Sequence, residues 1–184
     1  MRSSLIRHPA LRAAAAGAFT LVILSSSGCA AERAEPRPKQ RISVTLADRY
    51  TDLGRMKEDS TAVVLASAVG SGTAVRDGFP ITVTNLRVVK ILTGKISGPA
   101  FKVQQLGTRE IESPDTSRLM KTGRTYLLYL SKNDGKENPD HFVVTGGDGI
   151  YVLQGGRYLY RGGPPAGPGK QLPAELAADS VEGT

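Results

Sequence analysis

Side chains that commonly do covalent or acid–base chemistry are scarce in this sequence. The chain of 184 residues has one cysteine, Cys29, and two histidines, of which only His141 lies beyond the first forty residues. A serine hydrolase needs a nucleophile beside a base and an orienting acid, and no Gly-x-Ser-x-Gly segment accompanies His141. The carboxylates of residues 133–140 lack the ligand spacing of a calcium loop and are typical of a hairpin turn. We therefore expect no catalytic centre, metal site or cofactor.

The N-terminus has the pattern of a secretion signal. Arg2, Arg7 and Arg12 form a basic start without acidic residues, and residues 13–24 are an apolar run. Small residues at 25–28 then precede Cys29, which completes the order of a secretory signal peptide. The apolar run reaches only about 18 Å as a helix, too short for a hydrocarbon core of roughly 30 Å. We expect residues 1–28 to be cleaved rather than to span the membrane.

The residues before Cys29 resemble the lipobox of bacterial lipoproteins. Ser27, Gly28 and Cys29 match that pattern, while Ser26 stands where the family usually has leucine. The resemblance implies that the Cys29 sulfur carries diacylglycerol and that cleavage makes Cys29 the new N-terminus. Two acyl chains hold a protein stably on a bilayer. We expect a lipid anchor at Cys29, a polar tether over residues 29–40 and a domain on the extracytoplasmic face of the cell membrane.

The charge of the chain is mildly basic once the signal is removed. Loss of the three arginines of residues 1–28 lowers the formal net charge from +7 to +4. An extracytoplasmic location argues against a nucleic acid as partner. Distributed lysines and arginines are typical of a solvated surface, and they also allow weak attraction to anionic lipid heads or wall polymers.

The body of the chain, residues 41–161, is predicted to be one mainly β domain. The long segment 81–92 changes the phase of its apolar alternation, which indicates a bulge or bend. Residues 126–130 are apolar at every position, as in a central strand. A helix is expected over 46–58, and the Gly- and Pro-rich residues 162–184 are predicted to be a flexible tail, with a short helix possible at 173–179. The predicted strands are 62–66, 81–92, 101–104, 126–130, 142–144, 150–153 and 158–160.

Residues 59–160 resemble a group of exported bacterial proteins related to netrin-like and metalloproteinase-inhibitor domains. The matching segments are VVKILTG at the end of the long strand and KTGRTYLLYL further along. The resemblance implies a small OB-like barrel, closed or partly open, with one or two short helices. The inhibitors of that family act through an N-terminal cysteine. Because Cys29 is assigned to the lipid, their mechanism does not transfer to this chain.

The last predicted hairpin offers a possible binding surface at Arg157, Tyr158 and Tyr160. The alternation of the strand puts both tyrosines on one face, where they either contact a partner or pack into the core. We predict a lipid-anchored binding module for an envelope protein or wall polymer. The alternatives are a cell-envelope hydrolase that depends on His141 or Asp148, and a structural or lipid-handling lipoprotein.

Overall fold

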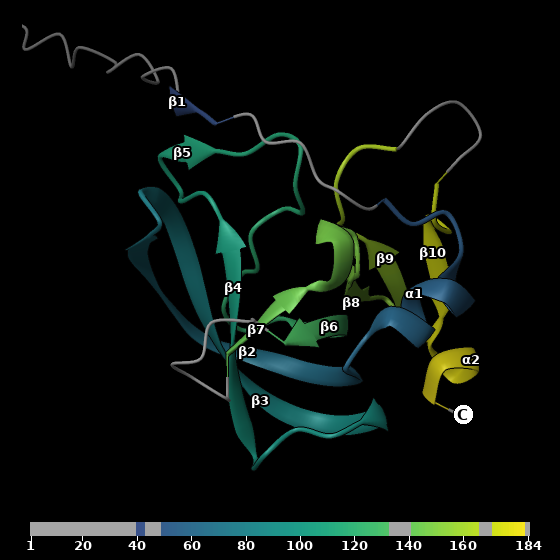
Figure 1. Ribbon diagram of the computed structural model, residues 1–184. Helices are drawn as coiled ribbons and strands as arrows, with labels where there is room; N and C mark the ends of the chain where they lie inside the picture. The colour runs from purple at the N-terminus through teal and green to yellow at the C-terminus, as the bar shows by residue number, and fades with distance from the viewer. Residues whose placement is uncertain (1–39, 43–48, 133–140, 166–170, 183–184) are drawn as a thin grey trace, which may run out of the picture. The chain divides into compact units, whose positions relative to one another are not determined.

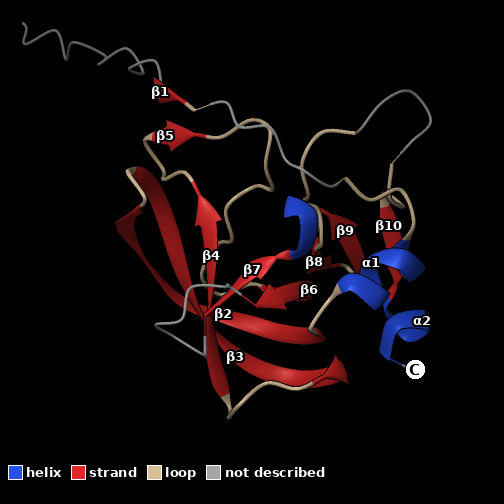
Figure 2. Ribbon diagram, viewed as in Figure 1, coloured by secondary structure: helices blue, strands red, loops and turns tan. Residues whose placement is uncertain are grey.

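The computed structural model describes residues 40–42, 49–132, 141–165 and 171–182. The predicted signal peptide, Cys29 and the tether up to residue 39 lie outside these residues. Within them the chain is mainly β, with two short α-helices (Figures 1 and 2). No helix among them has the length and apolar character needed to cross a bilayer. The elements are β1 (Gln40–Arg41), α1 (Leu53–Asp59), β2 (Ala62–Arg76), β3 (Phe79–Gly94), β4 (Ala100–Leu106), β5 (Ile111–Glu112), β6 (Thr125–Lys132), β7 (His141–Val144), the 3-10 turn η1 (Thr145–Gly147), β8 (Ile150–Gln154), β9 (Arg157–Tyr160), β10 (Glu175–Ala177) and α2 (Ala178–Glu182).

Five strands close into a ring. The large sheet has the order β10-β9-β8-β6-β2-β3-β4-β7, and β7 also pairs with β6. The pairing of β7 with β4 is parallel, whereas its pairing with β6 is antiparallel. The strands β6, β2, β3, β4 and β7 are therefore joined edge to edge, and β8, β9 and β10 extend the sheet from β6. This confirms the predicted mainly β fold with a partly ring-like strand order, while membership of the netrin-like family stays a prediction.

The long hairpin of β2 and β3 bends, and this curvature lets both strands take part in the ring (Figure 1). Its pairing shifts register between Val63 and Val64, between Leu65 and Ala66, and between Ala68 and Gly70. Bulges of this kind increase twist and re-aim the strand. The irregularity predicted for residues 81–92 is confirmed, because their partners on β2 shift register there.

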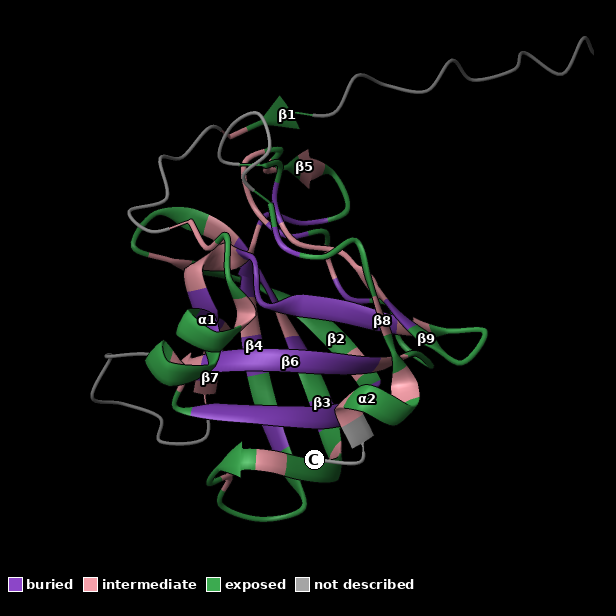
Figure 3. Ribbon diagram, turned by 90° about the vertical axis from the view of Figure 1, so that its right-hand side faces the viewer, coloured by how far each residue is buried: buried purple, intermediate pink, exposed green. Residues whose placement is uncertain are grey.

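Both faces of β6 are covered, as predicted from its apolar sequence. Tyr126 and Leu128 point into a cluster that receives side chains from all five ring strands and therefore fills the ring. Leu127 and Tyr129 point to the other face, where a second cluster forms with α1 and the chain around Leu172. In Figure 3, β6 and β8 are buried along most of their length. The two clusters make β6 the central strand between two apolar layers.

Helix α1 begins later than the predicted helix over 46–58. Asp52 is its N-cap, and the Asp52 carboxylate accepts a hydrogen bond of 2.8 Å from the backbone N–H of Arg55. Residues 49–52 precede the helix, and 43–48 lie outside the described residues. A side-chain oxygen that caps the first turn fixes where a helix starts. The helix places Met56 in the second cluster, where it is fully buried.

The segment predicted as a flexible tail is ordered over residues 171–182. Strand β10 pairs antiparallel with β9, with Leu176 opposite Tyr158. Leu172 is 2% exposed and packs in the second cluster. Residues 175–177 thus form a strand where a helix over 173–179 was considered possible, and α2 follows it. The tail prediction was wrong for these residues because their apolar side chains cover the outer face of β8 and β9.

Candidate functional site

The residues of the predicted binding surface, Arg157, Tyr158 and Tyr160, do not form one exposed surface. Tyr158 is 0% exposed and packs in the second cluster, so its prediction as a surface residue was wrong. Arg157 is exposed and forms an ion pair with Glu175 of β10. Tyr160 is half-buried, and its ring meets that of Tyr151 edge-on at 5.4 Å. The two tyrosines do share a face, but that face lies beneath the chain that follows residue 171.

Tyr160 belongs to a buried polar cluster around Asp148. The Tyr160 hydroxyl donates to Asp148 Oδ1 at 3.0 Å, and the backbone N–H of Gly163 donates to the same oxygen at 3.1 Å. Arg49 Nη1 lies 3.9 Å from Asp148 Oδ1. Burial raises the pKa of Asp148, while the Tyr160 hydroxyl, the Arg49 charge and the backbone of Gly163 and Tyr50 partly oppose the rise. The cluster fixes the chain that leaves β9.

Arg49 ties further segments to the same cluster. Its Nη2 donates to the carbonyl of Asp115 at 2.8 Å, and its Nη1 donates to the carbonyl of Pro164. The loop before β6 and the chain after β9 are thereby held to one guanidinium.

His141 and Asp148, on which the alternative of a hydrolase depends, make contacts within the fold. His141 begins β7, and its Nδ1 lies 3.0 Å from Nε2 of Gln104. Asp148 is 2% exposed, and the contacts given above occupy its carboxylate. Within the described part of the chain, no group of three or more His, Cys, Asp or Glu side chains is placed to hold a metal ion.

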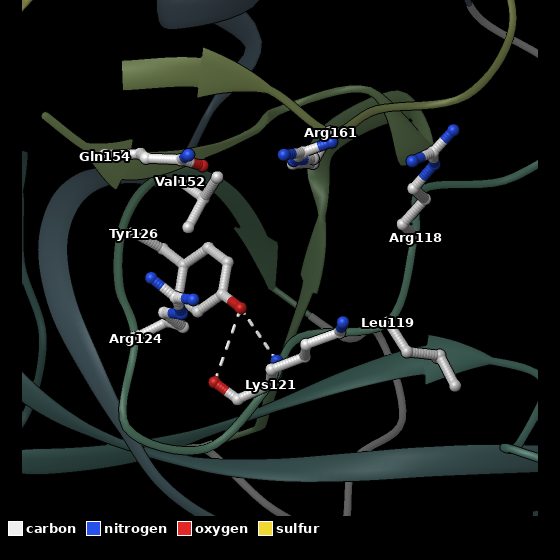
Figure 4. Close-up of a pocket in the computed structure, with 8 residues that line it drawn as sticks. All are labelled: Arg118, Leu119, Lys121, Arg124, Tyr126, Val152, Gln154 and Arg161. Carbon is white, nitrogen blue, oxygen red and sulfur yellow. Dashed lines mark hydrogen bonds between the residues drawn. The ribbon is translucent and has the colours of Figure 1, made fainter. Parts of the chain in front are cut away.

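A cationic cleft lies between the loop before β6 and the ends of β8 and β9. It has a volume of about 180 Å³. We call it the cationic cleft because four of its eight lining side chains are positively charged and none is acidic. Tyr126, Val152 and Leu119 provide apolar surface (Figure 4). Its lining residues are Arg118, Leu119, Lys121, Arg124, Tyr126, Val152, Gln154 and Arg161.

Gln105 fixes the loop that supplies two of the cations. It lies on β4 and is 5% exposed. Its Nε2 donates to Ser117 Oγ and to the carbonyl of Arg118, both at 3.0 Å. Its Oε1 accepts from the backbone N–H of Met120 at 2.9 Å. One buried amide therefore bonds to Ser117, Arg118 and Met120 of the loop and fixes the backbone on both sides of Arg118.

Hydrogen bonds of their own backbone groups also hold the four cationic residues. The backbone N–H of Arg118 donates to the carbonyl of Arg161 at 2.9 Å, and that of Arg161 donates to the carbonyl of Ile150 at 2.8 Å. The carbonyl of Arg124 accepts from Ala68 at 2.9 Å. The backbone N–H of Lys121 donates to the Tyr126 hydroxyl at 2.7 Å (Figure 4). All four charged residues of the cleft therefore extend from anchored backbone.

The turn into β6 needs a glycine at position 123. Gly123 has φ of 79°, a left-handed conformation that glycine adopts without steric cost. Its backbone N–H donates to the carbonyl of Ala68 at 2.8 Å. This turn separates Lys121 from Arg124 and brings both to the cleft.

No carboxylate of the described residues neutralises the charges of the cleft. Arg49, Arg55, Arg76 and Arg157 each lie within 4.0 Å of a carboxylate. Among the described residues, none of the four cleft cations makes such an ion pair. Their field acts on Tyr126, whose pKa burial raises while the charges of Arg124 and Arg161 lower it. The cleft is thus a site of positive potential over partly apolar walls.

A larger hollow of about 1180 Å³ adjoins the cleft. The two share Arg118, Leu119, Lys121 and Arg161. The hollow continues past the loop toward Arg109, and it also contains Glu112 and Tyr160. A ligand with an anionic group in the cleft has room for a larger body beside it.

Sequence analysis treated the lysines and arginines only as a distributed surface charge and did not single out these four. The usable signal was the spacing of Arg118, Lys121 and Arg124 at intervals of three with no acidic residue between them. Arg161 joins them only through the pairing of β8 with β6 and β9. No family model matches this chain, and no match to it was found among curated proteins.

Proposed function

We propose that this protein is a lipid-anchored, extracytoplasmic binding module that uses the cationic cleft to hold an anionic component of the cell envelope. The observation that carries the proposal is that Arg118, Lys121, Arg124 and Arg161 line one cleft, with no neutralising carboxylate in the part of the chain that the structure describes. Positive charge that has no internal partner, next to apolar surface, favours an external anion.

The composition of the cleft favours binding over catalysis. Its lining residues are cationic, apolar, phenolic or amide side chains. General acid–base catalysis most often uses histidine or a carboxylate near the reacting atoms. The Tyr126 hydroxyl is engaged with the backbone of Lys121, and burial raises its pKa, so it stays protonated at neutral pH.

The anchor at Cys29 is part of the proposal and rests on the signal pattern of the sequence. The segment from Ala30 to Gln40 would reach at most about 36–40 Å from the bilayer when extended. Such a tether would keep the cleft close to the membrane surface and to polymers of the envelope. This makes a local anion a better partner than a freely diffusing one.

Two measurements test the proposal separately. Labelling of cells with a fatty-acid analogue, followed by membrane fractionation, should give a labelled, membrane-bound wild type and an unlabelled Cys29→Ser variant. In the Cys29→Ser background, which has no acyl anchor to insert, purified envelope should bind the protein with an intact cleft and should bind an Arg124→Gln/Arg161→Gln variant much more weakly. Arg87→Gln, at an exposed position of β3 outside the cleft, is the matched control. Equal envelope binding by all three proteins would refute the role of the cleft.

A further inference from the structure

We infer that the group held in the cationic cleft is a phosphate, borne as an ester by a larger molecule whose body occupies the adjoining hollow. The inference rests on the proposed function and specifies its ligand. It is carried by the number of cations, by their directions of approach and by the sizes of the two spaces.

The four cations of the cleft suit phosphate better than a single carboxylate. A carboxylate carries one negative charge on two coplanar oxygens. A phosphodiester carries one charge on two oxygens that project from a tetrahedral phosphorus, and a phosphate monoester carries about −1.5 to −2 at pH 7 on three such oxygens. Arginine guanidinium groups bind phosphate oxygens through paired, charge-assisted hydrogen bonds. With three arginines and one lysine around one small space, a group with several charged oxygens satisfies more of the donors.

The positions of the cations also favour phosphate. Arg118, Lys121 and Arg124 lie at separate points of the loop before β6, and Arg161 directly follows β9. In Figure 4 the four side chains lie around the cleft instead of along one wall. The oxygens of phosphate are arranged tetrahedrally and accept from several sides, whereas the two oxygens of a carboxylate lie in one plane.

The volumes distinguish an ester from a free anion. The cleft, at about 180 Å³, is small beside the hollow and has room for one phosphate group between its cations. The hollow of about 1180 Å³ shares Arg118, Lys121 and Arg161 with the cleft, so the remainder of an ester can continue there.

The apolar part of the lining strengthens the interaction. Val152 is 7% exposed and Tyr126 is 4% exposed, so they form a poorly hydrated floor. Coulomb attraction increases as the local dielectric falls. A phosphate over this floor is bound more tightly than one beside fully solvated lysines, although added salt should still weaken it.

Calorimetric titration of the full-length protein in detergent tests the inference. Inorganic phosphate and pyrophosphate should bind, and acetate should bind at least about tenfold more weakly. Arg124→Gln and Arg161→Gln should each weaken phosphate binding by about tenfold, the loss typical of one charge-assisted hydrogen bond. Arg87→Gln should leave it unchanged, and thermal unfolding should show that all three variants fold. Equal binding of acetate and phosphate, or full affinity in the cleft variants, overturns the inference.

Two further arms identify the source of the phosphate. The Cys29→Ser chain, which cannot insert an acyl anchor, is mixed with phosphatidylglycerol vesicles and, separately, with a soluble glycerol-phosphate polymer. Binding to the vesicles that depends on Arg124 and Arg161 indicates a lipid headgroup. Binding to the polymer with the same dependence indicates a wall or secreted polymer. Binding to neither overturns the inference of a phosphate ester.

Failure of the inference can be told from failure of the proposed function. If binding of the protein to purified envelope still depends on the cleft arginines, but neither phosphate nor the polymer competes with it, the ligand is a different anion. The proposed binding function then remains supported. If envelope binding ignores the cleft arginines, the proposed function fails first.

Discussion

Replacement of Gln105 by leucine should destabilise the domain and disorder the loop beneath the cationic cleft. The side chain makes three hydrogen bonds, to Ser117, Arg118 and Met120. Leucine has a similar length but can make none of them. At roughly 1–1.5 kcal/mol for each bond, the free energy of unfolding should fall by about 3–4.5 kcal/mol. For a domain of this size that corresponds to about 10 °C or more in the melting temperature.

Urea denaturation followed by circular dichroism measures this loss, and Gln104→Leu is the matched control. Gln104 is the next residue of the same strand, but it is only half-buried. Its amide bonds to Arg76 and His141 at 2.9 and 3.0 Å lie where water can replace them. The control should therefore lose about 1 kcal/mol or less. If the two variants unfold within about 1 kcal/mol of each other, Gln105 is not what fixes the loop.

Three further changes test the buried contacts near the site. Tyr160→Phe removes the hydroxyl that donates to Asp148, and urea unfolding should show a loss of roughly 1.5–3 kcal/mol. Because burial raises the pKa of Asp148, the folded state holds the proton of this carboxyl more tightly than the unfolded state does. The stabilisation from this proton is complete below the unfolded pKa of about 3.9 and is lost as pH rises through the folded pKa. Unfolding of wild type and Asp148→Asn between pH 4 and pH 7 should therefore show wild type losing stability relative to the variant. Gly149→Ala would place a Cβ 2.6 Å from the Cβ of Tyr129 and should lower the melting temperature, at a cost of roughly 1–3 kcal/mol. Gly72→Ala meets no atom within 4 Å and should cost nothing.

Each of these expectations has a contrary result. An unchanged unfolding free energy in Tyr160→Phe would mean that the hydroxyl bond to Asp148 contributes nothing net. A wild type that gains stability relative to Asp148→Asn as pH rises would mean that the carboxylate has a lowered pKa. Equal melting temperatures for the two alanine variants would contradict the close packing of β6 against Gly149.

The local patterns of the strands were enough to predict the fold class. Residues 126–130, apolar at every position, form the central strand β6. The phase change within residues 81–92 marks the bulges of the long hairpin. Both signals lie within one strand, where alternation reports burial directly. The closure of the ring by β7 depends on pairing with two strands distant in sequence, and only the family resemblance suggested it.

The site was less accessible to sequence reasoning. Alternation assigned Tyr158 and Tyr160 to one face but could not say what covers that face. The cover comes from Leu172 and β10, which follow a Gly- and Pro-rich stretch typical of a free tail. The cleft cations lie in loops, where no strand alternation indicates which side chains share a surface. Arg161 is brought beside Arg118 by the pairing of β8 with β6 and β9 and by the hydrogen bond between the backbones of the two arginines.

The ordered chain after residue 171 has a consequence for how the protein behaves at high concentration. β9 alone would present an unpaired backbone edge beside the apolar side chains that Leu172 and Leu176 now cover. Exposed edges of this kind template aggregation between molecules. β10 occupies that edge and is itself only three residues long, preceded by Pro173 and followed directly by α2. Removal of the chain from Gln171 onward should therefore expose the edge of β9 and promote self-association, which light scattering at increasing protein concentration would detect.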